Sequence, residues 1–299
     1  MICVANISGV IKAVLLRLNI LKTSAVTGGV LGVAAVSNLA LAAKPEAWKM
    51  GLPEPVTPLA RMMKEFHDLW LLPVVFGVSI FVMILIAYTC WRFSEKRNPI
   101  PSKTTHNASL EVLWTGIPVI ILLVLAFPSL RLLYATDNVA DSDMTLKITG
   151  YQWYWNYEYP DHGGFNIDAY LAARTQEEAI EYNAERLLDT DNRIVIPTDT
   201  KIRLQFTSGD VLHNWSLSDF GVRVDTVPGR LSEAWVLVEK PGRYYGFCSE
   251  LCGVDHAYMP IMIDAVSPAE FDEWVLEAQD EFAATIPQNQ IKSQLASAE

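Results

Sequence analysis

Two hydrophobic patterns divide the chain. Residues 69–91 and residues 112–130 are apolar runs without a charged side chain. An α-helix needs about 20 apolar residues to cross the hydrocarbon core of a membrane, so each run is long enough to span it. Pro118 and Pro128 lie in the second run, where a partner helix can satisfy the carbonyl groups that they free. The pattern therefore predicts a transmembrane hairpin over residues 69–130.

The second pattern begins at Met144, where the helical period is lost. Short segments rich in Val, Ile, Thr and aromatic residues follow, several of them alternate apolar and polar positions, and Gly, Pro and Asp turns separate them. The strands are expected within residues 144–159, 192–209, 233–248 and 259–266. Residues 131–285 are therefore predicted to be an all-β sandwich or barrel. Two helices are expected within this region, at Thr175–Leu188 and at Pro268–Ala284.

The N-terminal region has the pattern of a secretory signal. Three basic residues precede an apolar run of mostly small side chains, and the run ends in Ala40-Leu41-Ala42, which offers a cleavage site. We expect a signal peptide at residues 1–42 that is removed, with an uncleaved membrane anchor as the alternative. Residues 43–68 then form an outer N-terminal segment. Residues 286–299 are expected to be a disordered tail.

Charge is distributed unevenly between the two regions. The first 130 residues hold 11 Lys and Arg against 6 Asp and Glu, whereas residues 131–299 hold 12 against 28. This separation supports a membrane part followed by an acidic globular domain. An acidic domain disfavours nucleic acid as a partner, because binding to phosphates requires Lys and Arg. It favours a basic protein, which the long-range field of the domain would attract.

The linker between the two spans predicts the topology. It is more basic than acidic, with Arg92, Lys96, Arg97 and Lys103 against Glu95 and Glu111. By the positive-inside rule this linker faces the cytoplasm, and the expected signal peptide gives the same orientation. We therefore expect a multi-pass protein of a bacterial plasma membrane with both termini and residues 131–299 on the periplasmic side.

Near the C-terminal end, the sequence GFCSELCGVDHAYMP places two thiols, a histidine and a methionine in one loop. A disulfide is the common fate of cysteines outside the cytoplasm, and the residues alone leave it open. Against it, closing so short a loop through Cys248 and Cys252 would add little stability. A thioredoxin-like dithiol and covalent haem attachment both require C-x-x-C, which this chain lacks.

Other ligand types accompany the two thiols. His256 and Met259 share their loop, and His213 lies upstream in SGDVLHNWSL, at an expected strand end that a sandwich could bring to the same rim. Zinc held by two Cys and two His is one alternative, but it leaves the methionine without a role. Thiolate, imidazole and thioether together favour copper, and two thiolates can bridge two copper ions.

Several motifs in order carry a resemblance to a known family. They are the two-span hairpin, THNASLEVLWTGIP, GYQWYWNYEYP, DVLHNW, VDTVPGR and CSELCGVDHAYMP. On these motifs the chain resembles subunit II of the haem–copper cytochrome c oxidases, of the bacterial or mitochondrial aa type that contains CuA. The resemblance covers nearly everything after the expected signal peptide.

This resemblance implies a cupredoxin-like β-barrel that holds the binuclear copper centre CuA. In the family pattern Cys248 and Cys252 would bridge the two coppers, His213 and Met259 would complete one, and His256 and the backbone carbonyl of Glu250 the other. The carboxylate of Glu250 would help to hold Mg²⁺ or Mn²⁺ at the interface with subunit I. A hard cation of this kind prefers oxygen ligands.

The resemblance also implies roles outside the copper loop. Trp153 would receive electrons from cytochrome c, Arg230 would reach toward haem propionates of subunit I with Asp225 as a nearby partner, and Glu111 would lie at the mouth of a proton channel. The cytochrome c docking surface would include Glu158, Asp210, Asp191 and Asp168. His67, His106 and His162 match no ligand position.

The implied function is electron input to a proton-pumping oxidase. The chain would accept electrons from cytochrome c and pass them to haem in subunit I, within a complex that also contains subunit III and membrane lipid. A quinol oxidase subunit would lack the cysteines, and nitrous oxide reductase would add a large histidine-rich domain. The remaining alternative is a periplasmic copper protein outside any oxidase. Phe247 and Ser218-Asp219 depart from the family pattern near the copper site or the dock.

Overall fold

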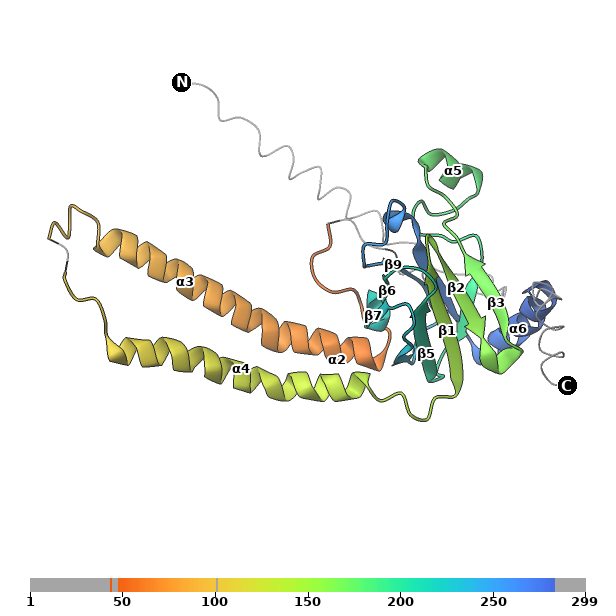
Figure 1. Ribbon diagram of the computed structural model, residues 1–299, viewed down its shortest axis with the longest axis horizontal. Coiled ribbons are helices and arrows are strands. Elements are labelled where there is room, and N and C mark those ends of the chain that lie inside the picture. The colour runs from red at the N-terminus through yellow and green to blue at the C-terminus, as the bar shows by residue number, and fades with distance from the viewer. Residues whose placement is uncertain (1–43, 45–47, 101, 283–299) are drawn as a thin grey trace, which may run out of the picture. The chain divides into compact units, whose positions relative to one another are not determined.

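A computed structural model describes residues 44, 48–100 and 102–282 of the 299-residue chain. The expected signal peptide at residues 1–42 and the expected tail at residues 286–299 lie outside the described residues. The described part contains a helical hairpin followed by a domain of β-strands, with one further long helix at its end (Figure 1). This agrees with the membrane-anchored, all-β architecture predicted from the hydrophobic pattern.

The hairpin helices extend beyond the uncharged runs. Helix α2 (Pro58–Phe66), a π-helical turn (His67–Leu71) and helix α3 (Leu72–Arg92) follow one another, and helix α4 covers Ala108–Thr136. Asn107 caps α4, because its side chain accepts a hydrogen bond from the Leu110 amide at 3.2 Å. Neither α3 nor α4 contains a buried residue, as expected for helices whose apolar surface meets lipid or partner helices.

In the described part of the chain, ten strands form two five-stranded sheets. In chain order they are β1 (Met144–Tyr151), β2 (Tyr154–Tyr159), β3 (Phe165–Ala169), β4 (Ile194–Pro197), β5 (Ile202–Ser208), β6 (His213–Leu217), β7 (Val222–Thr226), β8 (Ser232–Val236), β9 (Gly242–Cys248) and β10 (Pro260–Val266). One sheet has the order β3-β2-β1-β5-β8 and the other β4-β10-β9-β6-β7. The pairs β1–β5 and β4–β10 are parallel, and the remaining pairs are antiparallel.

Large aromatic residues dominate the core of the β domain. Trp155, Phe206 and Trp215 are fully buried, and alternate residues of β5 point inward as the period of two requires. The indole N–H of Trp215 donates a hydrogen bond to the Tyr157 hydroxyl at 3.1 Å, so the polar tips of both rings are satisfied inside the core. This packing holds the rim of the domain, where the cysteine loop lies, on a rigid base.

The two predicted helices of this domain differ in outcome. Helix α6 (Pro268–Phe282) is present and buries Phe271, Val275 and Ala278. The helix expected over Thr175–Leu188 is wrong in length, since α5 covers only Gln176–Glu181. It begins with a capping box, but Asn183 and Leu187 have positive φ values of 49° and 64°, which an α-helix cannot accommodate.

The segment before α2 is fastened to the β domain. The Val56 amide donates a hydrogen bond to the Asp219 carbonyl at 3.2 Å, and the Thr57 hydroxyl donates to the Phe220 carbonyl at 2.8 Å. Gly221 has a φ of 70°, and a Cβ there would lie 2.8 Å from Ala60 Cα. A glycine is therefore required where α2 meets the short helical turn that follows β6.

Candidate metal centre

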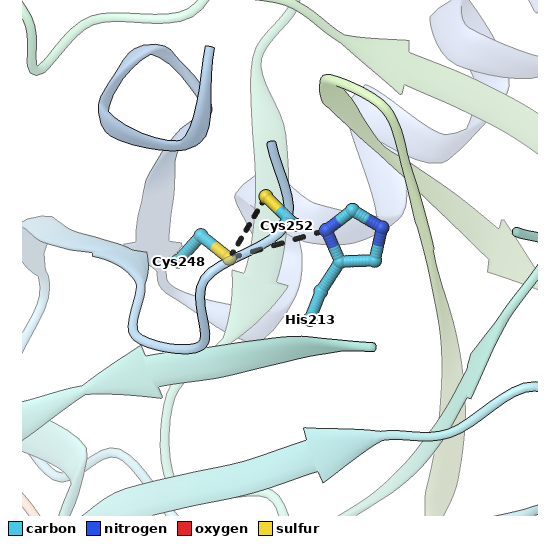
Figure 2. A group of neighbouring side chains, drawn as sticks. All are labelled: His213, Cys248 and Cys252. Carbon is cyan, nitrogen blue, oxygen red and sulfur yellow. Dashed lines mark hydrogen bonds between the residues drawn. The ribbon is translucent and has the colours of Figure 1, made fainter. Parts of the chain in front are cut away.

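The two thiols lie at the end of β9 and in the loop that follows it. Cys248 and Cys252 are each 4% exposed, and their sulfur atoms are 3.9 Å apart (Figure 2). A disulfide requires about 2.05 Å. Cys248 and Cys252 are therefore two free cysteines, and the disulfide interpretation does not describe this structure.

His213 meets these thiols from another part of the chain. It is the first residue of β6, which pairs with β9 so that Trp215 lies opposite Cys248. Its side chain is fully buried, and Nδ1 lies 4.0 Å from Cys248 Sγ. The ligand atoms of these three side chains all lie within 4.8 Å of one another, which is close enough for shared metal coordination (Figure 2).

The remaining predicted ligands gather around the same two sulfurs. His256 Nδ1 lies 3.5 Å from Cys252 Sγ, and Met259 Sδ lies 3.6 Å from it. The Glu250 carbonyl oxygen is 3.3 Å from Cys248 Sγ. All six positions predicted from the sequence are thus brought together at one rim of the domain.

The electrostatic surroundings of Cys248 and Cys252 favour a bound metal ion over two free thiols. Burial would raise the pKa of Cys248, but the neighbouring His213 side chain and the Asn214 amide lower it overall. Burial and the neighbouring Cys248 charge both raise the pKa of Cys252, so a second thiolate is costly in the absence of a cation. A bound cation would stabilise both thiolates at once.

The donor set fits copper. It offers two sulfurs that can become thiolates, two imidazoles, a thioether and a carbonyl, which exceeds the four donors of a tetrahedral zinc site. Soft sulfur donors combined with imidazole are typical of copper electron-transfer sites. The number of donors and the central position of both sulfurs suit a pair of ions better than a single one.

Trp153 packs directly against the cysteine loop. Its indole N–H donates to the Cys252 carbonyl at 3.3 Å, and the side-chain amide of Gln152 donates to the same oxygen at 2.7 Å. Gly253 makes this approach feasible, since a Cβ there would lie 3.0 Å from Trp153 Cζ2. The side chain of Trp153 is half-buried, whereas Trp155, two residues later, is in the core.

The four predicted docking carboxylates differ in their surroundings. Glu158 forms an ion pair with Lys147 at 2.7 Å, and Asp168 accepts a hydrogen bond from the Asn156 side chain at 2.8 Å. Asp191 accepts from the Tyr170 amide at 2.8 Å, and burial raises its pKa. Asp210 contacts His213 itself. This contact was not predicted from the sequence, although the Asp-x-x-His spacing of the two residues could have indicated it.

In the described part of the chain, the side chains of Arg230, Glu111 and Glu250 make no contact with the two sulfurs. Arg230 is exposed, and Asp225 accepts a hydrogen bond from the Asn214 side chain at 2.6 Å instead of pairing with it. Glu111 is exposed in the first turn of α4, where its carboxylate accepts from the Asn107 amide at 3.3 Å. The Glu250 side chain, between the two cysteines, is exposed.

Phe247 does not belong to the surroundings of the metal centre. It is 59% exposed, because successive residues of β9 point to opposite faces and Cys248 points inward. Of the two locations expected for it, the copper shell and the dock, an exposed side chain is compatible with the dock, and the effect of Phe247 stays a prediction. Asp219 is also remote from the sulfurs and lies, largely buried, under the segment that precedes α2.

The fold and the site together define a class of protein: a membrane-anchored cupredoxin-like domain with a metal centre of two cysteines. The family model for the periplasmic domain of cytochrome c oxidase subunit II matches residues 144–266, and the model for its transmembrane domain matches residues 45–132. The chain belongs to the cytochrome c oxidase subunit II family, and is thus a subunit of an oxidoreductase.

Individual relatives agree with this assignment. The chain is 41% identical over 245 residues to "Probable cytochrome c oxidase subunit 2" of Rickettsia bellii, covering 82% of this chain and 90% of that one. It is 42% identical over 243 residues to cytochrome c oxidase subunit 2 of Oenothera berteroana, covering 79% and 93%. It is also similar to the crystal structure of the periplasmic domain of subunit II from Bradyrhizobium japonicum, at 47% identity, 48% and 99% coverage and a TM-score of 0.44.

Proposed function

We propose that this chain is the electron-input subunit of a proton-pumping cytochrome c oxidase. It accepts electrons from cytochrome c at a binuclear copper centre, CuA, and passes them to haem in subunit I, where oxygen is reduced. The observation that carries this proposal is the convergence of His213, Cys248, Cys252, His256 and Met259, with the Glu250 carbonyl, at one rim of the domain.

The residues at this rim would have different roles in electron transfer. The bound copper pair supplies one-electron redox chemistry. The buried sulfurs and His213 exclude water from the centre, and the rigid strands β6 and β9 hold the ligands in place. Trp153, whose indole N–H donates to the carbonyl of Cys252, offers an aromatic contact between the half-exposed surface and a ligand residue.

Docking of cytochrome c is proposed for the acidic surface around Trp153. Glu158, Asp168, Asp191 and Asp210 are its candidate carboxylates, and the acidic excess of residues 131–299 supplies the long-range attraction. On the other side, Arg230 would face the haem propionates of subunit I, and the exposed carboxylate of Glu250 would share Mg²⁺ or Mn²⁺ with that subunit. Glu111 would open the proton channel at the cytoplasmic foot of α4.

The proposed location follows from the hairpin. Within the residues that the structure describes, two helices are long and apolar enough to cross a membrane, Pro58–Arg92 and Ala108–Thr136. Two crossings return the chain to its starting side, so we propose that both termini and the β domain are periplasmic, with the basic linker in the cytoplasm. Subunits I and III and membrane lipid would then surround the hairpin, whose exposed apolar side chains need such cover.

A copper stoichiometry experiment tests the proposal. The full-length chain, purified in detergent and reconstituted with copper, should hold two copper ions per chain, with a near-infrared band and an EPR signal of one unpaired electron shared between both ions. The variant Cys90→Ser, which removes an exposed thiol from α3, is the matched control and should behave like the wild type. A single zinc ion, or a Cys248–Cys252 disulfide that persists with copper present, would contradict the proposal.

A further inference from the structure

The carboxylate of Asp210 has both of its oxygens engaged within the domain. Oδ1 lies 2.9 Å from His213 Nε2 and accepts a hydrogen bond from the Val211 amide at 2.6 Å. Oδ2 accepts from the backbone amide of Gln152 at 2.7 Å. One side chain therefore joins the start of β6 to the segment that carries Trp153, between β1 and β2.

This contact determines which nitrogen of His213 can bind a metal. A carboxylate only accepts hydrogen bonds, so Nε2 of His213 must carry the proton. Nδ1 is then the nitrogen with a free lone pair, and it is the one that faces Cys248 Sγ, while Nε2 points away from both thiols (Figure 2). Metal-binding histidines are commonly fixed in this way by a carboxylate on the second nitrogen.

The second histidine of the site lacks this support. His256 is half-buried, and its Nδ1 faces Cys252. Among the residues that the structure describes, no hydrogen-bond partner is found for its Nε2. His213, by contrast, is fully buried. The two imidazoles of the same centre therefore have different hydrogen-bond environments, and Asp210 is the cause of the difference.

We propose that Asp210 is a positioning residue of the metal centre, in addition to any contribution it makes to docking. It fixes the tautomer and orientation of His213 through Oδ1, and it anchors the Gln152–Trp153 segment through Oδ2. This inference rests on the proposed copper centre. Since the carboxylate makes the imidazole a stronger donor and adds a negative charge near the copper, it stabilises the more oxidised state. Its loss raises the reduction potential and weakens copper binding by roughly 10–100-fold.

The inference makes a prediction about the unmodified protein. In the copper-loaded full-length chain, two exchangeable imidazole N–H protons should give hyperfine-shifted NMR signals. The His213 proton, held by Asp210 and buried, should exchange slowly with solvent, and the His256 proton should exchange quickly. Equal and fast exchange of both protons in the wild type would overturn the inference without any mutation.

The variant Asp210→Asn tests the role directly. It should accelerate exchange of the His213 proton and of the Gln152 amide, raise the reduction potential and lower copper affinity. Asp168→Asn is the matched control, because it removes one carboxylate charge from an exposed position on β3, where the carboxylate accepts a hydrogen bond from the Asn156 side chain and not from a ligand residue. Asp210→Glu, which keeps the carboxylate, should restore the potential and affinity in part.

The outcomes separate this inference from the proposed function. If the wild type binds two coppers but Asp210→Asn and Asp168→Asn have the same copper affinity, potential and exchange rates, Asp210 has no positioning role and the inference is wrong. If the wild type binds no copper pair, the proposed function fails, and this inference fails with it. Failure of Asp210→Asn to fold would leave the wild-type exchange measurement and Asp210→Glu as the deciding experiments.

Discussion

At the scale of single residues, the sulfur of Met259 can be removed with little effect on the stability of the fold. Met259 is 1% exposed, with Sδ 3.6 Å from Cys252 Sγ. Leucine has a similar volume, so Met259→Leu should cost less than about 1.5 kcal/mol of stability. It removes the thioether, and we therefore expect a changed EPR hyperfine pattern and a shifted reduction potential. Met262→Leu is the control, since Met262 is a buried methionine on β10, the strand that begins directly after Met259, and no contact of its sulfur with the ligand residues is found in the described part of the chain. Identical spectra for both variants would exclude Met259 as a ligand.

Trp153 offers a second prediction at this scale. Trp153→Phe keeps an aromatic ring but loses the N–H that bonds to the Cys252 carbonyl. Electron transfer from reduced cytochrome c should slow at least about tenfold, which corresponds to ~1.4 kcal/mol of barrier. Copper content should not change. Stopped-flow measurement of cytochrome c oxidation tests this, with Trp235→Phe as control because Trp235 bonds to the Ala135 carbonyl, away from the sulfurs. An unchanged rate would reject Trp153 as the electron input.

At the scale of elements, the loop between β9 and β10 depends on a glycine. Gly253 has a φ of 128°, and a Cβ there would lie 3.0 Å from Trp153 Cζ2 and 3.1 Å from Gln152 Nε2. Gly253→Ala should therefore cost about 1–3 kcal/mol in backbone strain and also displace the Trp153 segment. Gly164→Ala separates the two effects, since Gly164 has a φ of 68° with nothing within 4 Å of its Cβ. Both variants should have a lower unfolding temperature. Only Gly253→Ala should also have a lower rate of cytochrome c oxidation.

A pH-dependent stability is expected where the segment before α2 meets the β domain. Burial raises the pKa of the Asp219 carboxyl from 3.8 to about 6, although the charge of Lys49 lowers it in part. A carboxyl with a raised folded-state pKa takes up a proton on folding. The contribution of this carboxyl to the free energy of unfolding is thus greatest below about pH 4 and is lost as the pH rises to about 6, by ~3 kcal/mol in all.

The variant Asp219→Asn should remove this dependence. Unfolding of the detergent-solubilised chain, followed by near-ultraviolet circular dichroism between pH 4 and pH 7.5, measures it. Over this range the free energy of unfolding of the wild type should fall. The fall in Asp219→Asn should be smaller, and the difference should be most of the ~3 kcal/mol. The control is Asp168→Asn, an exposed carboxylate whose loss should leave the profile as in the wild type. Parallel profiles for wild type and Asp219→Asn would contradict the burial argument.

The elements show what sequence patterns can and cannot predict here. The hairpin and the strands around Trp155, Phe206 and Cys248 were predictable, since long apolar runs and period-two alternation directly record burial. Strands β3 and β7 were not predicted, and β6 was anticipated only as a strand end at His213, because all five residues of β6 are buried and show no alternation. The residues that meet at the metal centre were predicted from the resemblance of their motifs to a known family. The engagement of Asp210 was not, because it depends on a contact with Gln152 across 58 positions.

At the scale of the whole molecule, the distribution of charge separates anchoring from docking. The first 130 residues are net basic and the remainder has 28 acidic against 12 basic residues. Their acidic excess acts over about one Debye length, which is ~8 Å at physiological ionic strength, so it governs the encounter with a partner more than the final contact. An acidic domain held at the membrane by an apolar hairpin would concentrate a basic, diffusing electron donor near Trp153.

The last prediction concerns this field. The association rate of reduced cytochrome c with the copper-loaded protein should fall steeply between low and physiological salt, while electron transfer within the complex should change little. The double variant Asp168→Asn and Asp191→Asn should lower the association rate at low salt and flatten its salt dependence. Replacement of Glu270 and Glu273 on α6 by Gln removes the same charge from a helix remote from the sulfurs, and it should have a smaller effect. If both double variants reduce the rate equally, only net charge matters, and the docking surface around Trp153 is not the one proposed.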